Sequence, residues 1–310
     1  MSRMKPNAPA GIALALLAVL AVVGCGGGGK KSAATTAATT PGTTAATSTA
    51  AMNSKIAAEV PAKIKSKGTL TVAADATYAP NEFIGADGHT VEGMSPDLGH
   101  ALAGVMGLKA NFVNASFDTI IPGLSSGKYD LGISSFTDTK EREKVVDFVT
   151  YFSAGTSFYV KAQGGPTINT LADLCGQKVA VERGTTQAAD ATAQSSKCKK
   201  AGKPGVTVLV FPDQNAANLA LASGRGQVGM ADSPVAAYIV KKSNGQLKLS
   251  GQPYGTAPYG IAIPKGNGMA KPILDALKEL ISNGTYMSIL TKWGIQAGAI
   301  TNPTINGATS

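Results

Sequence analysis

Residues 117–148 read FDTIIPGLSSGKYDLGISSFTDTKEREKVVDF, and they contain a helix pattern that leads directly into a strand. The helix pattern ends at the GKYD sequence of 127–130, and 131–133 read as a short buried strand. The same alternation of short strands and helices continues in both directions from this stretch. Alternation of this kind predicts βαβ units and parallel sheets, with ligands bound at the strand ends. The expected fold class is therefore α/β.

Hydroxyl side chains follow the strand at 131–133, and one arginine follows them. Ser135 and Thr137 lie just beyond the strand, and Arg142 comes shortly after them. This combination suits a carboxylate, because an arginine offers a bidentate fork and hydroxyls donate to the remaining lone pairs. The spacing alone leaves a second interpretation open, in which the loop is simply polar and Arg142 is solvated or pairs with Glu141.

The alternating part of the chain divides into two similar series, which predicts two lobes. We expect one lobe at 61–155 together with 260–310, and the other at 160–254. Each lobe is expected to hold a mostly parallel sheet with flanking helices. Two extended stretches, 156–159 and 255–259, are expected to join the lobes as hinge strands, an arrangement that favours closure around a ligand.

The N-terminus has the pattern of a lipoprotein precursor. Arg3 and Lys5 precede the uncharged run GIALALLAVLAVVG, which is too short to span a bilayer comfortably and matches a signal-peptide core. The run leads into VVGC (22–25), which resembles the lipobox of bacterial lipoproteins. Residues 1–24 are therefore expected to be a lipoprotein signal peptide, with Cys25 as the lipidated residue. An ordinary secretory signal with an incidental cysteine remains the alternative.

Residues 25–60 are expected to be a disordered tether after the lipidated cysteine, because glycines and an Ala/Thr/Ser tract dominate them. The whole chain has a net charge of +9, which becomes +7 when Arg3 and Lys5 leave with the signal peptide. The positive charge is spread along the chain and aromatic residues are few, so a nucleic-acid surface is not expected.

The three cysteines separate into one lipid candidate and one pair. Cys175 and Cys198 remain beyond Cys25, and disulfides persist outside the cytoplasm. A bridge between them would stabilise the fold by about 3 kcal/mol in the chain-entropy model. Metal binding by two cysteines without a nearby histidine is much less favoured, and neither a metal nor a cofactor is expected.

A series of short motifs runs along the chain: GTLTV (68–72), DATYAP (75–80), GMSPDL (93–98), IPGL (121–124), GKYD (127–130), TDTKER (137–142), DF (147–148), GTTQ (184–187), ADSP (231–234), YGIAI (259–263), NGTY (283–286) and WG (293–294). In this order and spacing they resemble the extracytoplasmic solute-binding proteins of ABC transporters, specifically the polar amino-acid family. The resemblance covers nearly all of residues 68–293. It implies a two-lobed, periplasmic-binding-protein-like fold of type II.

The resemblance implies ligand contacts from both lobes. Arg142 matches the arginine that binds the ligand carboxylate in this family, and Ser135 and Thr137 match groups that donate to the same carboxylate. Thr186 lies at an expected helix start, where free backbone N–H groups also favour an anion. Asp232 matches the acid that takes the ligand ammonium group, although its position also suits a helix N-cap.

Further residues match the part of the site that holds the ligand side chain. Tyr78 and Phe117 match the aromatic walls of the family site, although two aromatic residues alone are more often part of a core. Asp75 matches a residue at the side-chain end of the site in proteins that bind basic amino acids, or it caps the following turn. Glu182 lies where the family places a pocket-lining residue, and Glu82 is expected near the same end.

Departures from the family pattern bear on the ligand. Ser95 stands where proteins that bind basic amino acids carry a carboxylate, and Asn81 replaces a common phenylalanine, which makes that wall more polar. The three acids Asp75, Glu82 and Glu182 would repel an acidic side chain, provided that Arg183 points away. A polar neutral or cationic amino acid is therefore expected.

The resemblance implies capture of such an amino acid by lobe closure and its delivery to an ABC permease. We expect a monomer, lipid-anchored on the extracytoplasmic face of the bacterial cell membrane. The chain has no nucleotide motif, so ATP is expected to be handled by a separate subunit. Two alternatives remain open. One is a periplasmic enzyme of the cyclohexadienyl dehydratase type, in which Glu82 or Glu182 would act as the acid; the other is a nutrient-sensor subunit.

Overall fold

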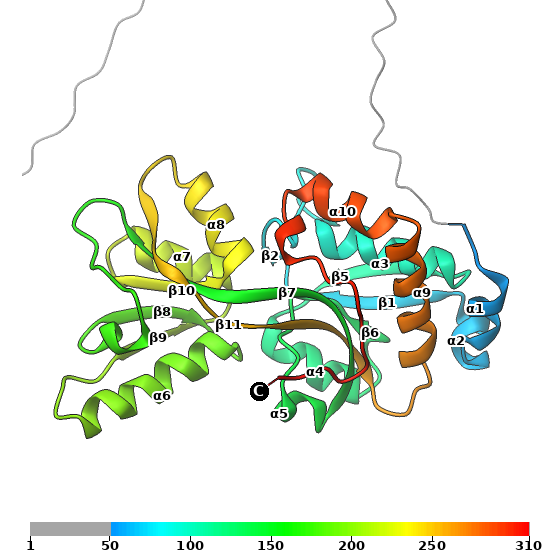
Figure 1. The fold of residues 1–310 in the computed structure, drawn as a ribbon, viewed down its shortest axis with the longest axis horizontal. Coiled ribbons are helices and arrows are strands. Elements are labelled where there is room, and N and C mark those ends of the chain that lie inside the picture. The colour runs from blue at the N-terminus through cyan, green and yellow to red at the C-terminus, as the bar shows by residue number, and fades with distance from the viewer. Residues whose placement is uncertain (1–50, 310) are drawn as a thin grey trace, which may run out of the picture. The chain divides into compact units, whose positions relative to one another are not determined.

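The computed structural model describes residues 51–309, in which short strands and helices alternate (Figure 1). The strands are β1 (Thr69–Ala74), β2 (Thr77–Tyr78), β3 (Glu82–Ile84), β4 (Val91–Glu92), β5 (Lys109–Asn114), β6 (Leu131–Gly132), β7 (Val146–Lys161), β8 (Lys178–Glu182), β9 (Thr207–Phe211), β10 (Val228–Asp232) and β11 (Leu247–Pro264). The helices are α1 (Ser54–Glu59), α2 (Ala62–Lys67), α3 (Met94–Val105), α4 (Phe117–Ser125), α5 (Lys140–Glu143), η1 (Leu171–Leu174), α6 (Thr186–Lys200), α7 (Gln214–Ala222), α8 (Ser233–Lys242), α9 (Ala270–Ser282), α10 (Thr285–Trp293) and η2 (Gln296–Gly298).

One hydrogen-bonded strand order, β5-β1-β6-β11-β7-β10-β8-β9, runs through two lobes. In the first lobe β5, β1 and β6 pair in parallel, and in the second lobe β10, β8 and β9 do so. The long antiparallel pair β7 and β11 crosses from one lobe to the other (Figure 1). The expected α/β class and two-lobed architecture are confirmed.

The crossing strand β11 is longer than the sequence pattern predicts. The pattern suggests separate strands at 246–249 and 258–263, whereas β11 is continuous and pairs with β7 through several register shifts between Ser250 and Gly260. These irregularities interrupt the regular pattern of inward and outward side chains, which explains why the sequence suggests two strands. The predicted hinge stretches lie within β7 and β11, and their role as hinges stays a prediction.

Regular structure begins closer to the N-terminus than the sequence predicts, because the last part of the predicted tether is helical. Asn53 begins α1: its Oδ1 accepts the N–H of Lys55 at 3.0 Å, and its Nδ2 donates to Glu279 of α9 at 2.6 Å. Ile56 and Val60 are buried in the core of the first lobe. The prediction of a tether up to residue 60 is therefore wrong for residues 53–60. The predicted signal peptide, Cys25 and the tether up to residue 50 lie outside the described residues.

A hydrophobic cluster built from both lobes lies next to the crossing strands. It contains Phe117 and Phe136 of the first lobe together with Ala231 and Val235 of the second. The rings of Phe117 and Phe136 are stacked, with their centroids 4.5 Å apart. Burial of these side chains favours contact between the lobes, since each lobe alone would leave part of this apolar area in water.

A disulfide joins Cys175 to Cys198 within the second lobe, with 5.6 Å between the two Cα atoms, as the sequence predicts. Cys198 lies near the end of α6, which reaches Lys200, whereas the sequence pattern predicts a helix only over 186–193. The last turns of α6 are rich in Ser and Lys, so an apolar period does not mark them. Cys198 is nevertheless buried there, and the covalent bridge attaches this end of the helix to the lobe.

Replacing both Cys175 and Cys198 by alanine is expected to lower the free energy of unfolding by about 3 kcal/mol, because the unfolded chain loses a cross-link. Thermal unfolding of the double variant and of the wild type would measure this change. Neither cysteine lines the cavity described below. Ligand affinity should therefore stay unchanged, and equal melting temperatures would show that the bridge does not stabilise the fold.

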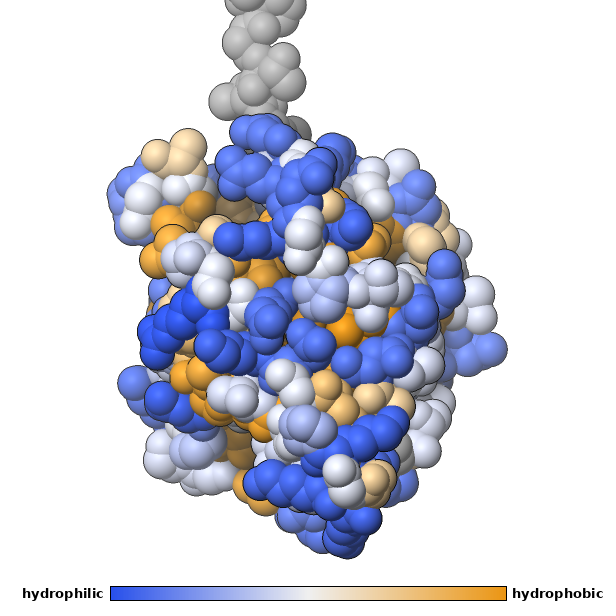
Figure 2. Space-filling model, turned by 90° about the vertical axis from the view of Figure 1, so that its left-hand side faces the viewer, coloured by the Kyte–Doolittle hydropathy of each residue, from blue (hydrophilic) through white to orange (hydrophobic). Residues whose placement is uncertain are grey.

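The outer end of the second lobe is mostly hydrophilic, and its hydrophobic areas are interspersed with polar side chains (Figure 2). Val210 and Leu219 are exposed large apolar side chains of this lobe. Isolated exposed apolar residues are ordinary on a protein surface and indicate no particular partner. Within residues 51–309, every helix is too short or too polar to cross a membrane.

Candidate functional site

A cavity lies between the two lobes, where several strands and helices end. Seven of the ten ligand-binding residues predicted from the sequence line it, and five further residues complete its wall. The first lobe contributes the segment after β6 and the helix α5, and the second contributes the starts of α6 and α8. The lining residues are Tyr78, Phe117, Ser135, Thr137, Arg142, Thr185, Thr186, Gln187, Gln214, Ala231, Asp232 and Val235.

The two lobes touch around this cavity, so the structure is closed. Arg142 Nη2 donates to the carbonyl oxygen of Gly184 at 3.0 Å, from the first lobe to the second. On the same rim, Arg183 Nη1 lies 3.5 Å from the Asp118 carboxylate. Gly184 has a φ of +79°, and a Cβ atom there would lie 3.0 Å from Cβ of Asp118, so glycine permits the close approach of the lobes.

Arg142 is held at the cavity wall by its own short helix and by an aromatic ring. The hydroxyl of Thr139 caps α5 by accepting the backbone N–H of Arg142 at 3.2 Å. The guanidinium carbon lies 5.2 Å from the centre of the Phe117 ring, and Nη1 donates to the Thr137 carbonyl at 2.8 Å. Since a guanidinium has five N–H groups and two of them reach backbone carbonyls, three remain for a ligand.

The alternative interpretation of a simple polar loop is not what the structure shows. Glu141 is exposed and pairs with Lys144 at 2.5 Å, not with Arg142. Burial lowers the pKa of Arg142 from its usual value, and the charge of Asp232 across the cavity counteracts that shift. The guanidinium stays charged, so a partly buried positive charge faces the cavity.

Ser135 lies at the cavity wall in an uncommon backbone conformation, with a φ of +50°. Its hydroxyl accepts from Asn81 Nδ2 at 2.9 Å and donates to Glu82 Oε1 at 2.8 Å. Glu82 is fully buried behind Ser135 and does not line the cavity. Burial raises the pKa of Glu82 well above its usual value. Burial thus favours the neutral form of Glu82, which holds Ser135 in place by accepting from its hydroxyl.

Asp232 lies at the end of β10 and faces the cavity from the second lobe. One carboxylate oxygen accepts from Gln187 Nε2 at 2.7 Å, and the other accepts from the Tyr259 hydroxyl at 2.6 Å. Although Asp232 occupies the N-cap position of α8, its side chain makes no capping hydrogen bond. Burial raises its pKa to about 6, while these two donors and Arg142 lower it. Asp232 is therefore mostly charged at neutral pH.

Asp75 and Glu182 do not line the cavity, contrary to the sequence prediction. They lie behind its wall at Tyr78, where two acidic side chains come together, one from each lobe. Asp75 follows β1 and accepts from the Thr77 hydroxyl at 2.6 Å and from the Phe117 N–H at 2.9 Å, so it caps α4. Glu182 ends β8, and neither of its oxygens has a hydrogen-bond partner within residues 51–309. The Tyr78 hydroxyl, which lies beside Glu182, is buried and also lacks a partner there.

The electrostatics of this acidic pair are unfavourable in the closed protein. Burial and then the Asp75 charge raise the pKa of Glu182 far above its usual value. Burial also raises the pKa of Asp75, and Asp213 adds to that shift. Within the described residues, no lysine or arginine forms an ion pair with Asp75 or Glu182. Two such carboxyls share a proton unless a cation lies near them.

Several residues of the wall, and one partner of a wall residue, were not predicted from the sequence. Gln187 is the last residue of the GTTQ motif, and its amide also donates to Thr156 at 2.9 Å. Tyr259 begins the YGIAI motif, but its contact with Asp232 joins two segments that are distant in the chain. Gln214 gave no signal, because an amide at a helix start is ordinary. The missed residues are mainly partners of predicted ones.

Comparisons with known proteins find relatives in sequence. The family model of the bacterial extracellular solute-binding proteins, family 3, matches residues 70–296. The arginine-binding protein ArgT of Corynebacterium glutamicum is 34% identical over 253 residues, which are 81% of this chain and 83% of that protein.

Two solved structures share the fold. An ancestral arginine-binding protein bound to arginine is 40% identical with a TM-score of 0.66, covering 73% of this chain and 98% of that chain. The ancestral amino acid-binding protein AncCDT-1, described as a precursor of cyclohexadienyl dehydratase, is 35% identical with a TM-score of 0.64, covering 74% and 97%.

Proposed function

Because this chain belongs to the bacterial extracellular solute-binding proteins of family 3, we propose that it captures an amino acid with a cationic side chain between its lobes. It is a binding protein of amino-acid ABC transport rather than an enzyme, as expected from the sequence, since its relatives are named as binding proteins. The acidic pair Asp75 and Glu182 is the observation that supports a cationic side chain.

The charged groups of the ligand backbone fit the two sides of the cavity. Arg142 of the first lobe offers three free N–H groups for the carboxylate, with Thr137 beside it. Asp232 of the second lobe offers a carboxylate, fixed by two donors, for the ammonium group. Each lobe thus supplies one charge, and a bound amino acid stabilises the closed state because it contacts both.

The side chain of the ligand then extends past Tyr78 toward the acidic pair. A guanidinium or ammonium group placed there replaces the shared proton and gives Glu182 the donor that its oxygens lack. A neutral side chain would leave the two carboxyls sharing a proton, and an acidic one would add a third charge of the same sign. The site therefore selects for a positive side chain, in agreement with the arginine that relatives are named for.

A thermal-shift screen of the purified protein against the standard amino acids and ornithine tests this function. Arginine, lysine or ornithine should raise the melting temperature at micromolar concentrations, because a ligand that binds only the folded state stabilises it. Glutamate and aspartate should have no effect. A larger shift with a neutral amino acid would contradict the proposed selectivity, and no shift with any amino acid would contradict the function.

We further propose that Cys25 carries a lipid, that the mature protein is a monomer tethered outside the membrane, and that it serves a permease with a separate ATPase. The sequence VVGC at 22–25 supports the anchor. A Cys25→Ser variant should remain uncleaved before residue 25 and should not incorporate labelled fatty acid. Normal cleavage of this variant at the same position would contradict the anchor.

A further inference from the structure

Residues 304–308 lie along the start of β7 as an extended segment, which we call the C-terminal strap. Thr150 donates its N–H to the Thr304 carbonyl at 2.9 Å, and Val149 and Ile305 form an antiparallel bridge. Asn306 then bonds Phe148 twice: its N–H donates to the Phe148 carbonyl at 2.9 Å, and its Oδ1 accepts the Phe148 N–H at 2.8 Å. The strap is thereby fixed in register.

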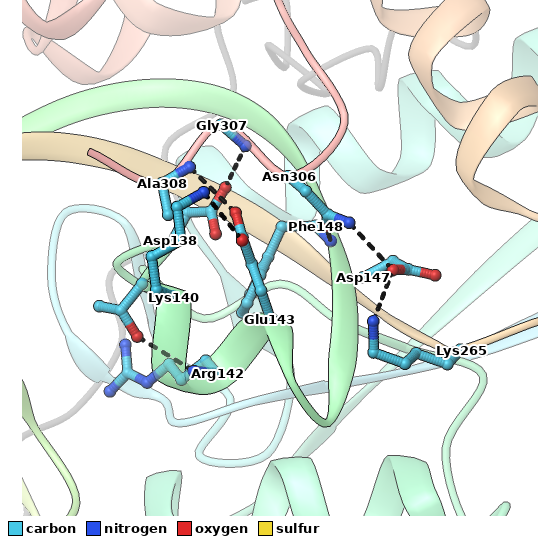
Figure 3. A network of polar contacts seen from close by, with 11 residues as sticks. Asp138, Lys140, Arg142, Glu143, Asp147, Phe148, Lys265, Asn306, Gly307 and Ala308 are labelled. Carbon is cyan, nitrogen blue, oxygen red and sulfur yellow. Dashed lines mark hydrogen bonds and ion pairs between the residues drawn. The ribbon is translucent and has the colours of Figure 1, made fainter. Parts of the chain in front are cut away.

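The strap ends on two acids, one before and one after Arg142 in the sequence (Figure 3). The N–H of Gly307 donates to Asp138 Oδ2 at 2.8 Å, and the N–H of Ala308 donates to Glu143 Oε1 at 3.1 Å. Asp138 is fully buried, and its other oxygen has no hydrogen-bond partner within the described residues. Burying a carboxyl with so few hydrogen-bond donors costs free energy of folding. The Gly307 N–H of the strap offsets part of that cost.

Residues 137–143 contain the parts of the site expected to bind a carboxylate. Thr137 accepts from the Arg142 guanidinium, and Thr139 caps the helix that carries it. Asp138 also donates its own N–H to the Pro258 carbonyl of β11 at 2.8 Å. The strap therefore holds this segment at Asp138, near its beginning, and at Glu143, its end, with Arg142 between the two.

We propose that the C-terminal strap, attached through Asp138 and Glu143, is a positioning element that fixes Arg142 for the ligand carboxylate. The inference rests on the proposed function, because it assumes that Arg142 binds that carboxylate. Neither Asp138 nor the strap lines the cavity, so both act through Arg142.

The charges around Asp138 predict how this attachment responds to pH. Burial raises the pKa of Asp138 to about 7; the Gly307 N–H lowers it, the charge of Glu143 raises it, and Lys140 lowers it. On the other side of the strap, Asp147 pairs with Lys265 at 3.1 Å and accepts from Asn306 Nδ2 at 3.1 Å. Below its pKa, Asp138 is neutral and does not repel Glu143. Above that pKa, the Asp138 and Glu143 carboxylates are both negative and repel each other. Ionisation of Asp138 strengthens its bond to the Gly307 N–H, but burial is the larger effect and Glu143 adds repulsion, so the packing around Asp138 as a whole should become less stable as the pH rises through 7.

Two variants remove the attachment in different ways. Asp138→Ala removes the acceptor of the Gly307 N–H, and a chain that ends at Asn306 removes both strap donors while leaving Asp138 in place. Asp138→Asn keeps an acceptor but cannot titrate. Asp147→Ala is the matched control, because it removes an acidic side chain that contacts the strap without touching residues 137–143.

The experiment combines hydrogen exchange of the ligand-free protein with titration of L-arginine and L-argininamide, which lacks the carboxylate. In Asp138→Ala and in the truncated chain, the amides of Arg142 and Glu143 should exchange about tenfold faster, since a local hydrogen bond is lost. The affinity for L-arginine should fall about tenfold, and that for L-argininamide should stay unchanged. Asp138→Asn should bind L-arginine about as tightly as the wild type, but its affinity should no longer depend on pH near 7. Asp147→Ala should resemble the wild type in exchange and in affinity.

Equal losses for L-arginine and L-argininamide, or unchanged exchange at 137–143 in both variants, would overturn the positioning role. The exchange measurement needs no ligand, so it decides the role of the strap by itself. Failure of the wild type to bind L-arginine would instead contradict the proposed ligand, and the two failures are thereby distinguished.

Discussion

Replacing Arg142 by alanine is expected to reduce the affinity for L-arginine about a thousandfold, because the ligand carboxylate would be buried without its charged partner. The ligand-free protein should melt at nearly the same temperature. Arg142 contributes two hydrogen bonds to backbone carbonyls and contact with two aromatic rings, but it also carries a partly buried charge whose removal offsets part of that loss. Calorimetric titration gives the affinity, and a thermal melt gives the stability.

The matched control for this prediction is Arg183→Ala. Arg183 lies on the rim of the same cleft and pairs with Asp118 across the lobes, but it is more than half exposed and does not line the cavity. Its loss should change the affinity by less than about threefold, as expected for an exposed ion pair. Retained affinity in Arg142→Ala would remove Arg142 from the site, and equal losses in both variants would indicate a general effect on closure.

Replacing Glu182 by glutamine is expected to lower the affinity for L-arginine about a hundredfold and to leave the affinity for L-glutamine unchanged. The reason is that the change removes the charge that faces the ligand side chain. Glu182 is the better test of the acidic pair, since Asp75 also caps α4 and its loss would disturb that helix. Glu141→Gln, at an exposed acid outside the cavity, is the control for a change in net charge. An unchanged affinity for L-arginine would place its side chain elsewhere.

The pH dependence of Glu182→Gln provides a second part of the same test. The closed structure raises the pKa of Glu182, so its charged form is disfavoured there. This cost is absent below the usual pKa, where the carboxyl is neutral in any state, and it grows as the pH rises. A bound cation replaces the proton, so the affinity for L-arginine should rise with pH in the wild type and less steeply in the variant. Subtracting the profile for L-glutamine removes the effect of Asp232, which every amino-acid ligand shares.

Much of the cavity could be predicted because its residues stand at the ends of strands and at helix starts. Ser135 and Thr137 follow β6, Asp232 ends β10, and Thr186 begins α6. In an α/β sheet these ends converge on one edge, so motifs that are far apart in sequence point to one site. The family resemblance supplied the order of the motifs, and the fold brought seven of the predicted residues to one cavity.

Features that depend on contacts between distant segments could not be predicted. Glu82 was expected near the ligand side chain, but it supports Ser135 from behind. The sequence gives no sign that Ala308 reaches Glu143, or that Tyr259 reaches Asp232. The helix α1 was missed for a similar reason: Ile56 is buried only because α9 lies beside it, and a short helix without a partner would be marginal in water.

Calorimetric titration of L-arginine into the purified protein, beside L-glutamine under the same conditions, would show whether the site selects a cationic side chain. We expect one site per chain, micromolar or tighter affinity for L-arginine, which corresponds to about −8 kcal/mol or better, and weaker binding of L-glutamine. In buffers of different ionisation enthalpy, L-arginine should release more protons than L-glutamine, because its cation replaces the proton between Asp75 and Glu182. Tighter binding of L-glutamine, or equal proton release by the two ligands, would contradict the claim that the acidic pair selects a cationic side chain.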